Sequence, residues 1–314
     1  MRRRRQRAIR FATFALVLAT VSTQTSDATN DRTGARFAAP GSFIWVGRHR
    51  IHLNCSGEGS PTVIFDSGLG GSSLDWVRVQ PRVASFTRAC SYDRAGYGWS
   101  DPGPRPRDSA NISSELESLL GNASVPAPYV LVGHSFGGFN VRLYSHNHPE
   151  QVAGLVLVDS SHEDQFRRFE EAGVGSTAPR HGTFIIRNGL QIPDGLPNDV
   201  AHIAQLFAIR RSSMTAFRSE LQHLRRSAKQ IRNASWLPDI PIVVISHRVD
   251  GTITSSTEAK RAEIWMDMQS DLARRALRGK HVISATDDHY IQLSQPQLIV
   301  DSIRDVIERS RQLR

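Results

Sequence analysis

The pentapeptide Gly-x-Ser-x-Gly, preceded by an apolar run, constrains the fold of this chain more than any other feature. Residues 129–138 read YVLVGHSFGG, so the apolar run leads directly into Gly133, Ser135 and Gly137. A nucleophilic serine must stand clear of the backbone, and a sharp turn from a strand into a helix achieves this. Such a turn crowds the positions two before and two after the serine, where glycine fits best. The pattern predicts a strand, a turn carrying Ser135 and a helix; the alternative is a glycine-rich turn that holds a serine by chance.

Two further residues complete a set suited to serine catalysis. The β-branched run 241–246 predicts a buried strand, and Asp250 follows it on a loop. The run 281–284 predicts another strand, and His289 lies on the loop beyond it. If these strands are parallel, their carboxyl ends converge on one crevice. We therefore expect Ser135, Asp250 and His289 to meet there. His289 would accept the serine proton, and Asp250 would fix the tautomer of the histidine.

Asp159 is the alternative acid. It follows the apolar run 154–158, which also predicts a strand, so its carboxylate belongs to the same predicted crevice. We favour Asp250 because the strand and loop over 241–250 have the more usual form for a triad acid.

A serine nucleophile also needs backbone N–H groups that face the developing negative charge. The amide of Phe136, directly after Ser135, is one candidate. The run 62–66 predicts an earlier strand, and the loop 67–71 after it reads SGLGG. We assign the second N–H group to Leu69; a plain flexible turn is the alternative for this loop.

These residues together resemble the serine hydrolases of the α/β-hydrolase superfamily, over about residues 42–314. The segment 92–101, YDRAGYGWSD, is similar to the turn after the fourth strand of that superfamily. The resemblance implies an α/β-hydrolase fold, with a mostly parallel eight-stranded sheet flanked by helices. Ser67 stands where many members have histidine, and Asp288 stands where many have glycine before the catalytic histidine.

The resemblance implies hydrolysis of a small-molecule carboxylic ester through an acyl-enzyme intermediate. Thioesterase, lactonase, amidase and cofactor-free haloperoxidase activities are alternatives on the same fold, and so is a catalytically silent ligand-binding protein. Ser135 argues against dehalogenases and epoxide hydrolases of this fold, which use aspartate at the same turn. We expect neither a cofactor nor a metal ion.

An insertion interrupts the alternation of strands and helices between residues 160 and 239. Apolar residues recur there at helical spacing, which predicts one long amphipathic helix: Ile203, Phe207, Met214, Phe217, Leu221 and Leu224. The resemblance implies that 160–239 is a helical cap between the sixth and seventh strands of a core formed by 42–159 and 240–314. Such a cap would cover an apolar pocket.

The basic residues concentrate at the start of the chain. The formal net charge is +9, but six arginines lie in the first ten residues, and without them the excess falls to +3 (9 minus 6). This balance, with no basic stripe elsewhere, argues against nucleic-acid binding. A basic start followed by the apolar run 11–21 is typical of a secretory signal. We expect 1–28 to be a signal peptide or a short membrane anchor, with 29–41 as linker, on a secreted, periplasmic or outer-face-anchored protein.

The only two cysteines, Cys55 and Cys90, bear on the same question. In the sheet order that the resemblance implies, the strands carrying them are neighbours, so a disulfide can form. Export would favour it. Two buried free thiols are the alternative.

Overall fold

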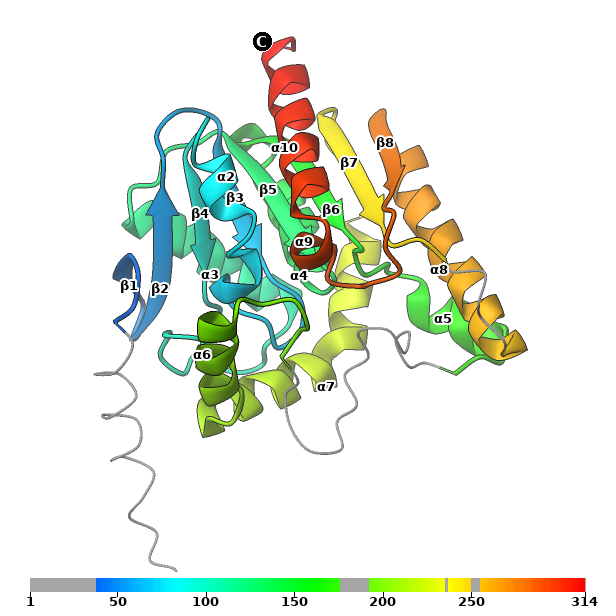
Figure 1. Ribbon diagram of the computed structural model, residues 1–314, viewed down its shortest axis with the longest axis horizontal. Helices are drawn as coiled ribbons and strands as arrows, with labels where there is room; N and C mark the ends of the chain where they lie inside the picture. Colours follow the sequence, from blue (N-terminus) through cyan, green and yellow to red (C-terminus); the bar gives the residue numbers. More distant parts are fainter. Residues whose placement is uncertain (1–37, 176–191, 235–236, 250–254, 314) are drawn as a thin grey trace, which may run out of the picture. The chain divides into compact units, whose positions relative to one another are not determined.

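An eight-stranded sheet organises the protein, with strands in the order β1-β2-β4-β3-β5-β6-β7-β8 (Figure 1). The computed structural model describes residues 38–175, 192–234, 237–249 and 255–313. Strand β2 is antiparallel to both of its neighbours, and every pairing from β4 to β8 is parallel. The strands are β1 (Ser42–Val46), β2 (His49–Ser56), β3 (Thr62–Asp66), β4 (Ala89–Tyr92), β5 (Tyr129–His134), β6 (Val152–Val158), β7 (Pro241–Ser246) and β8 (Arg278–Ile283). The predicted mostly parallel eight-stranded sheet is confirmed.

Helices cover both faces of this sheet. Helices α3, α4 and α8 pack on one face, and α2 and α10 pack on the other (Figure 1). Helices α5, α6 and α7 lie between β6 and β7 in the sequence. The helices are η1 (Ser73–Trp76), α2 (Gln80–Val83), α3 (Ser109–Asn122), α4 (Gly137–Asn147), η2 (Pro149–Gln151), α5 (Gln165–Glu171), α6 (Asn198–Ala208), α7 (Arg211–Asn233), α8 (Ser256–Arg274), α9 (Ile291–Ser294) and α10 (Pro296–Arg311).

The central strands are apolar on both faces because both faces are covered. Successive side chains of a strand point to opposite sides. Leu131 of β5 therefore packs with α3 and α4, whereas Val130 and Val132 pack with α2 and α10. All three side chains are fully buried. Burial of each such side chain contributes roughly 1.5–3 kcal/mol, so these layers hold the strand ends in fixed positions.

The long helix predicted in the insertion is two helices. Helix α6 ends at Ala208 and α7 begins at Arg211, and Arg210 between them has an extended backbone (φ −68°, ψ 142°). Its guanidinium lies 4.2 Å from the ring centroid of Phe207 and donates to the carbonyl of Gly98. These contacts hold the extended residue against the body, and periodicity alone does not report such a break.

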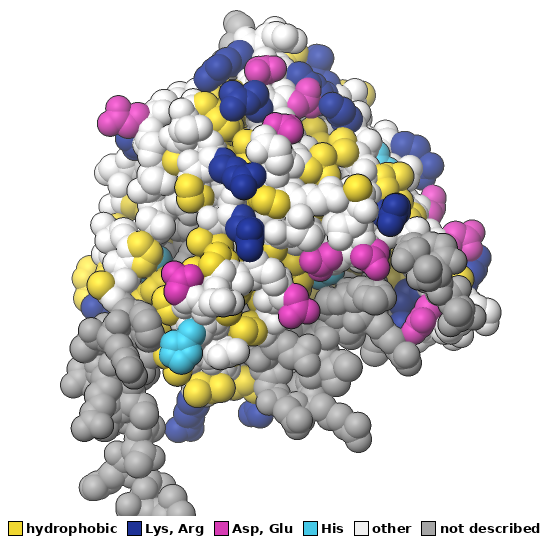
Figure 2. All heavy atoms as spheres, viewed as in Figure 1, with side chains coloured by type: hydrophobic (Ala, Val, Ile, Leu, Met, Phe, Trp, Pro, Cys, Tyr) yellow, Lys and Arg dark blue, Asp and Glu magenta, His cyan; other side chains and the backbone are white. Residues whose placement is uncertain are grey.

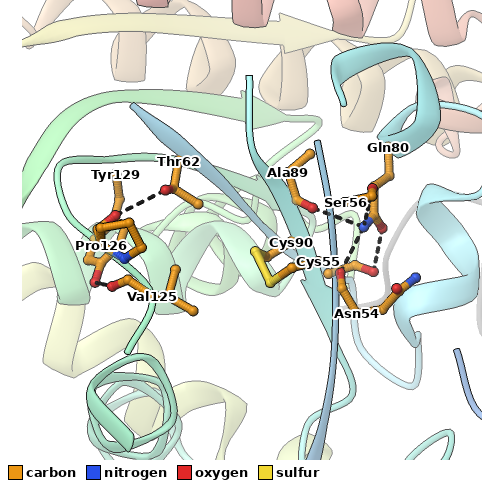
Figure 3. Close-up of a disulfide and its surroundings, with 11 residues drawn as sticks. Asn54, Cys55, Ser56, Thr62, Gln80, Ala89, Cys90, Val125, Pro126 and Tyr129 are labelled. Carbon is orange, nitrogen blue, oxygen red and sulfur yellow. Dashed lines mark hydrogen bonds between the residues drawn. A yellow bond between two sulfur atoms is a disulfide. The ribbon is translucent and has the colours of Figure 1, made fainter. Parts of the chain in front are cut away.

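A disulfide joins Cys55 of β2 to Cys90 of β4 (Figure 3). The two residues are register partners in this antiparallel pair, with Cα atoms 4.1 Å apart. The amide of Gln80 bonds both strands beside the disulfide, with donation to the carbonyls of Asn54 and Ala89 (Figure 3). Of the two alternatives that the sequence left open, the structure has the disulfide and not two free thiols, and the edge hairpin β1–β2 is tied to the parallel part of the sheet.

The surface carries charges of both signs. On the face drawn in Figure 2, lysine and arginine side chains are interspersed with aspartate and glutamate. Across the described ranges, no helix has the length and apolar character needed to cross a membrane. The predicted signal segment 1–28 and residues 29–37 of the predicted linker lie outside the described residues.

Candidate active site

Ser135 occupies a tight turn between β5 and α4, as predicted. Its φ of +51° is a left-handed value that costs a non-glycine residue about 1–3 kcal/mol. Its N–H donates to the carbonyl of Val158, and its carbonyl accepts from the N–H groups of Gly138 and Ser161. These bonds hold the strained residue at the carboxyl ends of β5 and β6.

Both glycines of the pentapeptide lie where a larger residue would clash with neighbouring atoms. A Cβ on Gly133 would lie 2.6 Å from Val141 Cγ2, and one on Gly137 would lie 2.3 Å from the carbonyl oxygen of Asp66. The turn therefore packs against both α4 and the end of β3. The crowding expected from the sequence is present at both positions.

His289, on the loop after β8, faces Asp159, at the end of β6. Nδ1 of His289 lies 2.5 Å from Oδ2 of Asp159. A carboxylate accepts this bond, so Nδ1 carries the proton and Nε2 keeps a free lone pair. In this tautomer Nε2 can act as a base.

The carboxylate of Asp159 has two further side-chain partners. Nε1 of Trp265 on α8 donates to Oδ1 at 2.8 Å, and Nδ1 of His247, just after β7, lies 2.8 Å from Oδ2. Burial alone would raise the pKa of Asp159, but the charge of His247 and the hydrogen bonds from His247 and His289 hold that pKa well below its ordinary value. Asp159 is therefore ionised, and it draws the loops after β7 and β8 together.

The contact with Asp159 also shifts the pKa of His247. Burial lowers its pKa, but the negative charge and hydrogen bond of Asp159 outweigh burial, so the pKa of His247 is raised. Sequence reasoning missed both His247 and Trp265. The only local signal was the place of His247 directly after a predicted strand.

His134, the residue before Ser135, positions the loop of His289. Its Nε2 lies 3.0 Å from the backbone carbonyl of His289 and must donate, because a carbonyl only accepts. The two rings lie 4.6 Å apart between centroids. Burial, followed by the nearby His289, lowers the pKa of His134 to about 3, so this histidine is neutral near pH 7. It thereby links the serine turn to the histidine loop.

The loop after β3 lies against the serine turn. A Cβ on Gly68 would lie 3.3 Å from Cβ of Ser135, so this glycine packs directly on the serine. Leu69 and Phe136 are buried, and neither backbone amide donates a hydrogen bond to another residue of the described ranges. Two N–H groups, one directly after Ser135 and one directly after Gly68, thus have no acceptor within the described ranges.

The predicted acid Asp250 lies outside the described residues. The structure pairs His289 with the alternative acid, Asp159, whose carboxylate already takes donors on both oxygens. Asp159 has a left-handed backbone (φ +43°) at the end of β6, and its carboxylate faces His289 on the loop after β8.

A cavity lies between the loop after β3 and helix α6. Its volume is about 30 Å³, so it is small, and it is partly open to solvent. Its walls include Gly70 and Gly71 of the loop, Tyr290 beside His289, and Phe207 of α6. Asp75 borders it too, and Oδ2 of this buried carboxylate has no hydrogen-bond partner within the described part of the chain. Burial, followed by the nearby negative charge of Asp93, raises the pKa of Asp75 to about 7 even though Arg94 opposes the shift.

A metal site would require several ligating side chains around one point. Among the described residues, no group of three or more histidine, cysteine, aspartate or glutamate side chains is placed to hold a metal ion. Asp159 and its two histidines instead form direct hydrogen bonds.

A mostly parallel sheet with a strained serine at a strand–helix turn, and a histidine–aspartate pair at the same edge of that sheet, is the arrangement typical of α/β proteins built around a serine nucleophile. The sequence profile described as "alpha/beta hydrolase fold" matches residues 61–248, and the chain belongs to this family.

One curated relative matches part of the chain, and two solved structures share its fold. Over 134 residues, 40% of this chain, it is 34% identical to "Probable transporter efuK" of Hormonema carpetanum, and the match covers 19% of that relative. A putative lipase from Acinetobacter baumannii AYE superimposes with a TM-score of 0.67 at 16% identity, covering 91% of this chain and 97% of that one. A thermophilic esterase from Thermogutta terrifontis gives a TM-score of 0.58 at 17% identity, covering 86% and 98%. The chain thus spans about a fifth of the curated relative and nearly all of both solved structures.

Proposed function

We propose that this chain is a serine hydrolase that cleaves a carboxylic ester, with Ser135 as nucleophile, His289 as base and Asp159 as acid. The observation that carries the proposal is the 2.5 Å pair of His289 Nδ1 and Asp159 Oδ2, because it leaves Nε2 of the histidine free as a base. The left-handed turn at Ser135 supports the same conclusion, since strain of this kind is retained where a side chain must be presented.

The reaction follows from these roles. Ser135 Oγ attacks the ester carbonyl while His289 Nε2 takes its proton, and the N–H groups of Leu69 and Phe136 bind the oxygen that becomes negative. The C–O bond to the alcohol breaks, and His289 returns the proton to the leaving oxygen. Water, deprotonated by the same histidine, then attacks the acyl-enzyme and releases the carboxylic acid and free Ser135.

The apolar side chains of Phe207 and of Tyr290, which is next to His289, line the small cavity beside the loop after β3 and support an apolar acyl group as part of the substrate. We assign the helices α5, α6 and α7 the role of a cap, within the predicted range 160–239, because α6 contributes Phe207 and Ala204 to this cavity. Residues 176–191 and 235–236 of that range lie outside the described residues. A cap that excludes water protects an acyl-enzyme from premature hydrolysis.

The proposal is tested by reaction of the purified protein with a fluorophosphonate, which phosphonylates activated serines. We expect a single adduct that mass spectrometry maps to Ser135, no adduct in Ser135→Ala, and turnover of p-nitrophenyl esters by the wild type alone. A folded wild-type protein that neither reacts with the probe nor cleaves any ester would overturn the proposal in favour of a ligand-binding protein.

We also propose that the protein works outside the reducing cytoplasm, secreted or anchored through residues 1–28. The Cys55–Cys90 disulfide supports this, because disulfides persist in oxidising compartments. The test is the intact mass of protein recovered from a secreting host. A start near residue 29 identifies a cleaved signal, a retained N-terminus in the membrane fraction identifies an anchor, and accumulation only in the cytoplasm contradicts the proposal.

A further inference from the structure

Arg94 connects the loop after β3 to helix α7. Arg94 lies just after β4 and is 2% exposed. Its guanidinium donates five hydrogen bonds. Nη1 donates to Asp66 Oδ1 at 2.7 Å and to the carbonyl of Ser67 at 2.6 Å, and Nη2 donates to the carbonyl of Gly68 at 2.7 Å. Nε donates to Glu220 Oε1 at 2.9 Å, and Nη2 also donates to Oε2 at 3.1 Å. One side chain thus binds two successive carbonyls of the loop and a carboxylate of the inserted helix.

These contacts determine the direction of one particular amide. A trans peptide is planar, so its N–H points opposite to its carbonyl. Arg94 holds the carbonyl of Gly68, and the N–H of the same peptide belongs to Leu69. Gly68 packs on Ser135, at 3.3 Å for an added Cβ. The guanidinium therefore fixes the orientation of the N–H group that we assign to the oxyanion.

Glu220 holds Arg94 in this orientation. It is fully buried on α7, 126 residues away in the sequence, and it also accepts from the Tyr97 hydroxyl at 2.9 Å. Without its carboxylate, Nε of Arg94 would lose its acceptor and Asp66 would be the remaining anionic partner. The planar guanidinium directs several N–H donors at separate acceptors in fixed directions, whereas the ammonium group of lysine is a single point charge and cannot reproduce this geometry.

We propose that Arg94 and Glu220 are positioning residues of the oxyanion hole, through which helix α7 sets the orientation of the Leu69 amide. The inference rests on the proposed function and deepens it. It makes the inserted helices part of the catalytic apparatus: a displacement of α7 that removed Glu220 would release the loop carbonyls and disorder the oxyanion hole.

A buried ion pair with a purely structural role would have a different signature. Neutralising either partner would lower the melting temperature without a specific effect on turnover. The chain offers a matched control in Glu163, a buried carboxylate that binds Arg142 and Arg275 and has no contact with the loop after β3. Glu163→Gln therefore reports the cost of neutralising a buried carboxylate in this fold.

The experiment compares Glu220→Gln, Arg94→Lys and Glu163→Gln in the full chain. For each variant, kcat and KM on a p-nitrophenyl ester, the rate constant of Ser135 phosphonylation and the melting temperature are measured. We expect kcat and the phosphonylation rate to fall about 10- to 100-fold in Glu220→Gln and Arg94→Lys, with KM changed less than about two-fold. This loss is smaller than the roughly 10²–10³-fold loss of kcat that follows when an oxyanion-hole donor is removed outright. Glu163→Gln should lose melting temperature and keep kcat.

Tyr97→Phe provides a milder test if the charged variants fail to fold. It removes one hydrogen bond to Glu220 and leaves every charge in place, so a smaller loss of kcat at unchanged KM is expected. Unchanged kcat in the folded variants, or an equal loss of kcat in Glu163→Gln, would overturn the inference while the wild type still labels at Ser135. A wild type that does not label overturns the proposed function itself, and the inference with it.

Discussion

Oδ2 of Asp159 lies 2.5 Å from Nδ1 of His289, although 130 residues separate them in the sequence. The contact forms because β6 and β8 are parallel and both end at the same edge of the sheet, where Asp159 and the loop of His289 follow them. It defines the acid of the proposed triad, and it makes that assignment testable against the second carboxylate, Asp250.

Asp159→Asn should reduce kcat by roughly 10³–10⁴-fold, because an amide in this position favours the wrong histidine tautomer. Asp250→Asn should retain kcat within a few-fold. Steady-state kinetics on one ester, with circular dichroism to establish folding, provides the measurement. The assignment fails if Asp250→Asn loses turnover while Asp159→Asn keeps it.

His247→Gln should destabilise the protein most at acidic pH. The pKa of His247 is raised by Asp159, so its charged form contributes stability that is present below the unfolded pKa of about 6.5 and is lost as pH rises through the higher folded value. The melting temperature of the variant should lie furthest below that of the wild type near pH 5. The difference should shrink by pH 8.5, and a constant difference over this range would contradict the role of the charge.

Asp75→Asn should show a dependence in the same direction, for a different physical reason. The folded pKa of Asp75 is raised to about 7, so folding favours its protonated form and the wild type loses stability between about pH 4 and pH 7. Neutral asparagine does not titrate. The melting temperature of the variant relative to wild type should therefore be higher at pH 8 than at pH 5, and scans of both proteins across this range would detect the trend. A relative melting temperature that is flat or falls with pH would refute the raised pKa.

Phe207→Ala should enlarge the cavity beside the loop after β3. Because this side chain is buried and lines the cavity from α6, its loss should shift kcat/KM toward longer acyl chains in a series of p-nitrophenyl esters. Ile209→Ala, next to α6 but 78% exposed, is the matched control and should leave the acyl profile unchanged. Parallel acyl profiles for Phe207→Ala and wild type would mean that the acyl group binds elsewhere.

Much of this fold could be predicted from local pattern. The run 241–246 is β7 residue for residue. The serine turn could be predicted because its glycines are imposed by contacts within a short segment.

The remaining features depend on contacts between distant segments. Asp159 and Asp250 both follow predicted strands, and nothing in the local sequence pattern decides which of the two meets His289. Arg94 and Glu220 are separated by 126 residues, and no periodicity or spacing joins them. Sequence patterns report the neighbours that a residue has along one element, whereas these pairs depend on how elements pack.

Asp159 also affects how a protein of this design can evolve. Its N–H donates a hydrogen bond to the carbonyl of Ile245. Its carboxylate accepts hydrogen bonds from the side chains of Trp265, His247 and His289. One residue therefore joins β6, β7, α8 and the histidine loop. A lineage that moved the acid to another strand end would need to replace all of these bonds at the same time. Substitutions in the cavity lining do not require several hydrogen bonds to be replaced at once. Divergence within this architecture should therefore change substrate preference long before it changes the position of the acid.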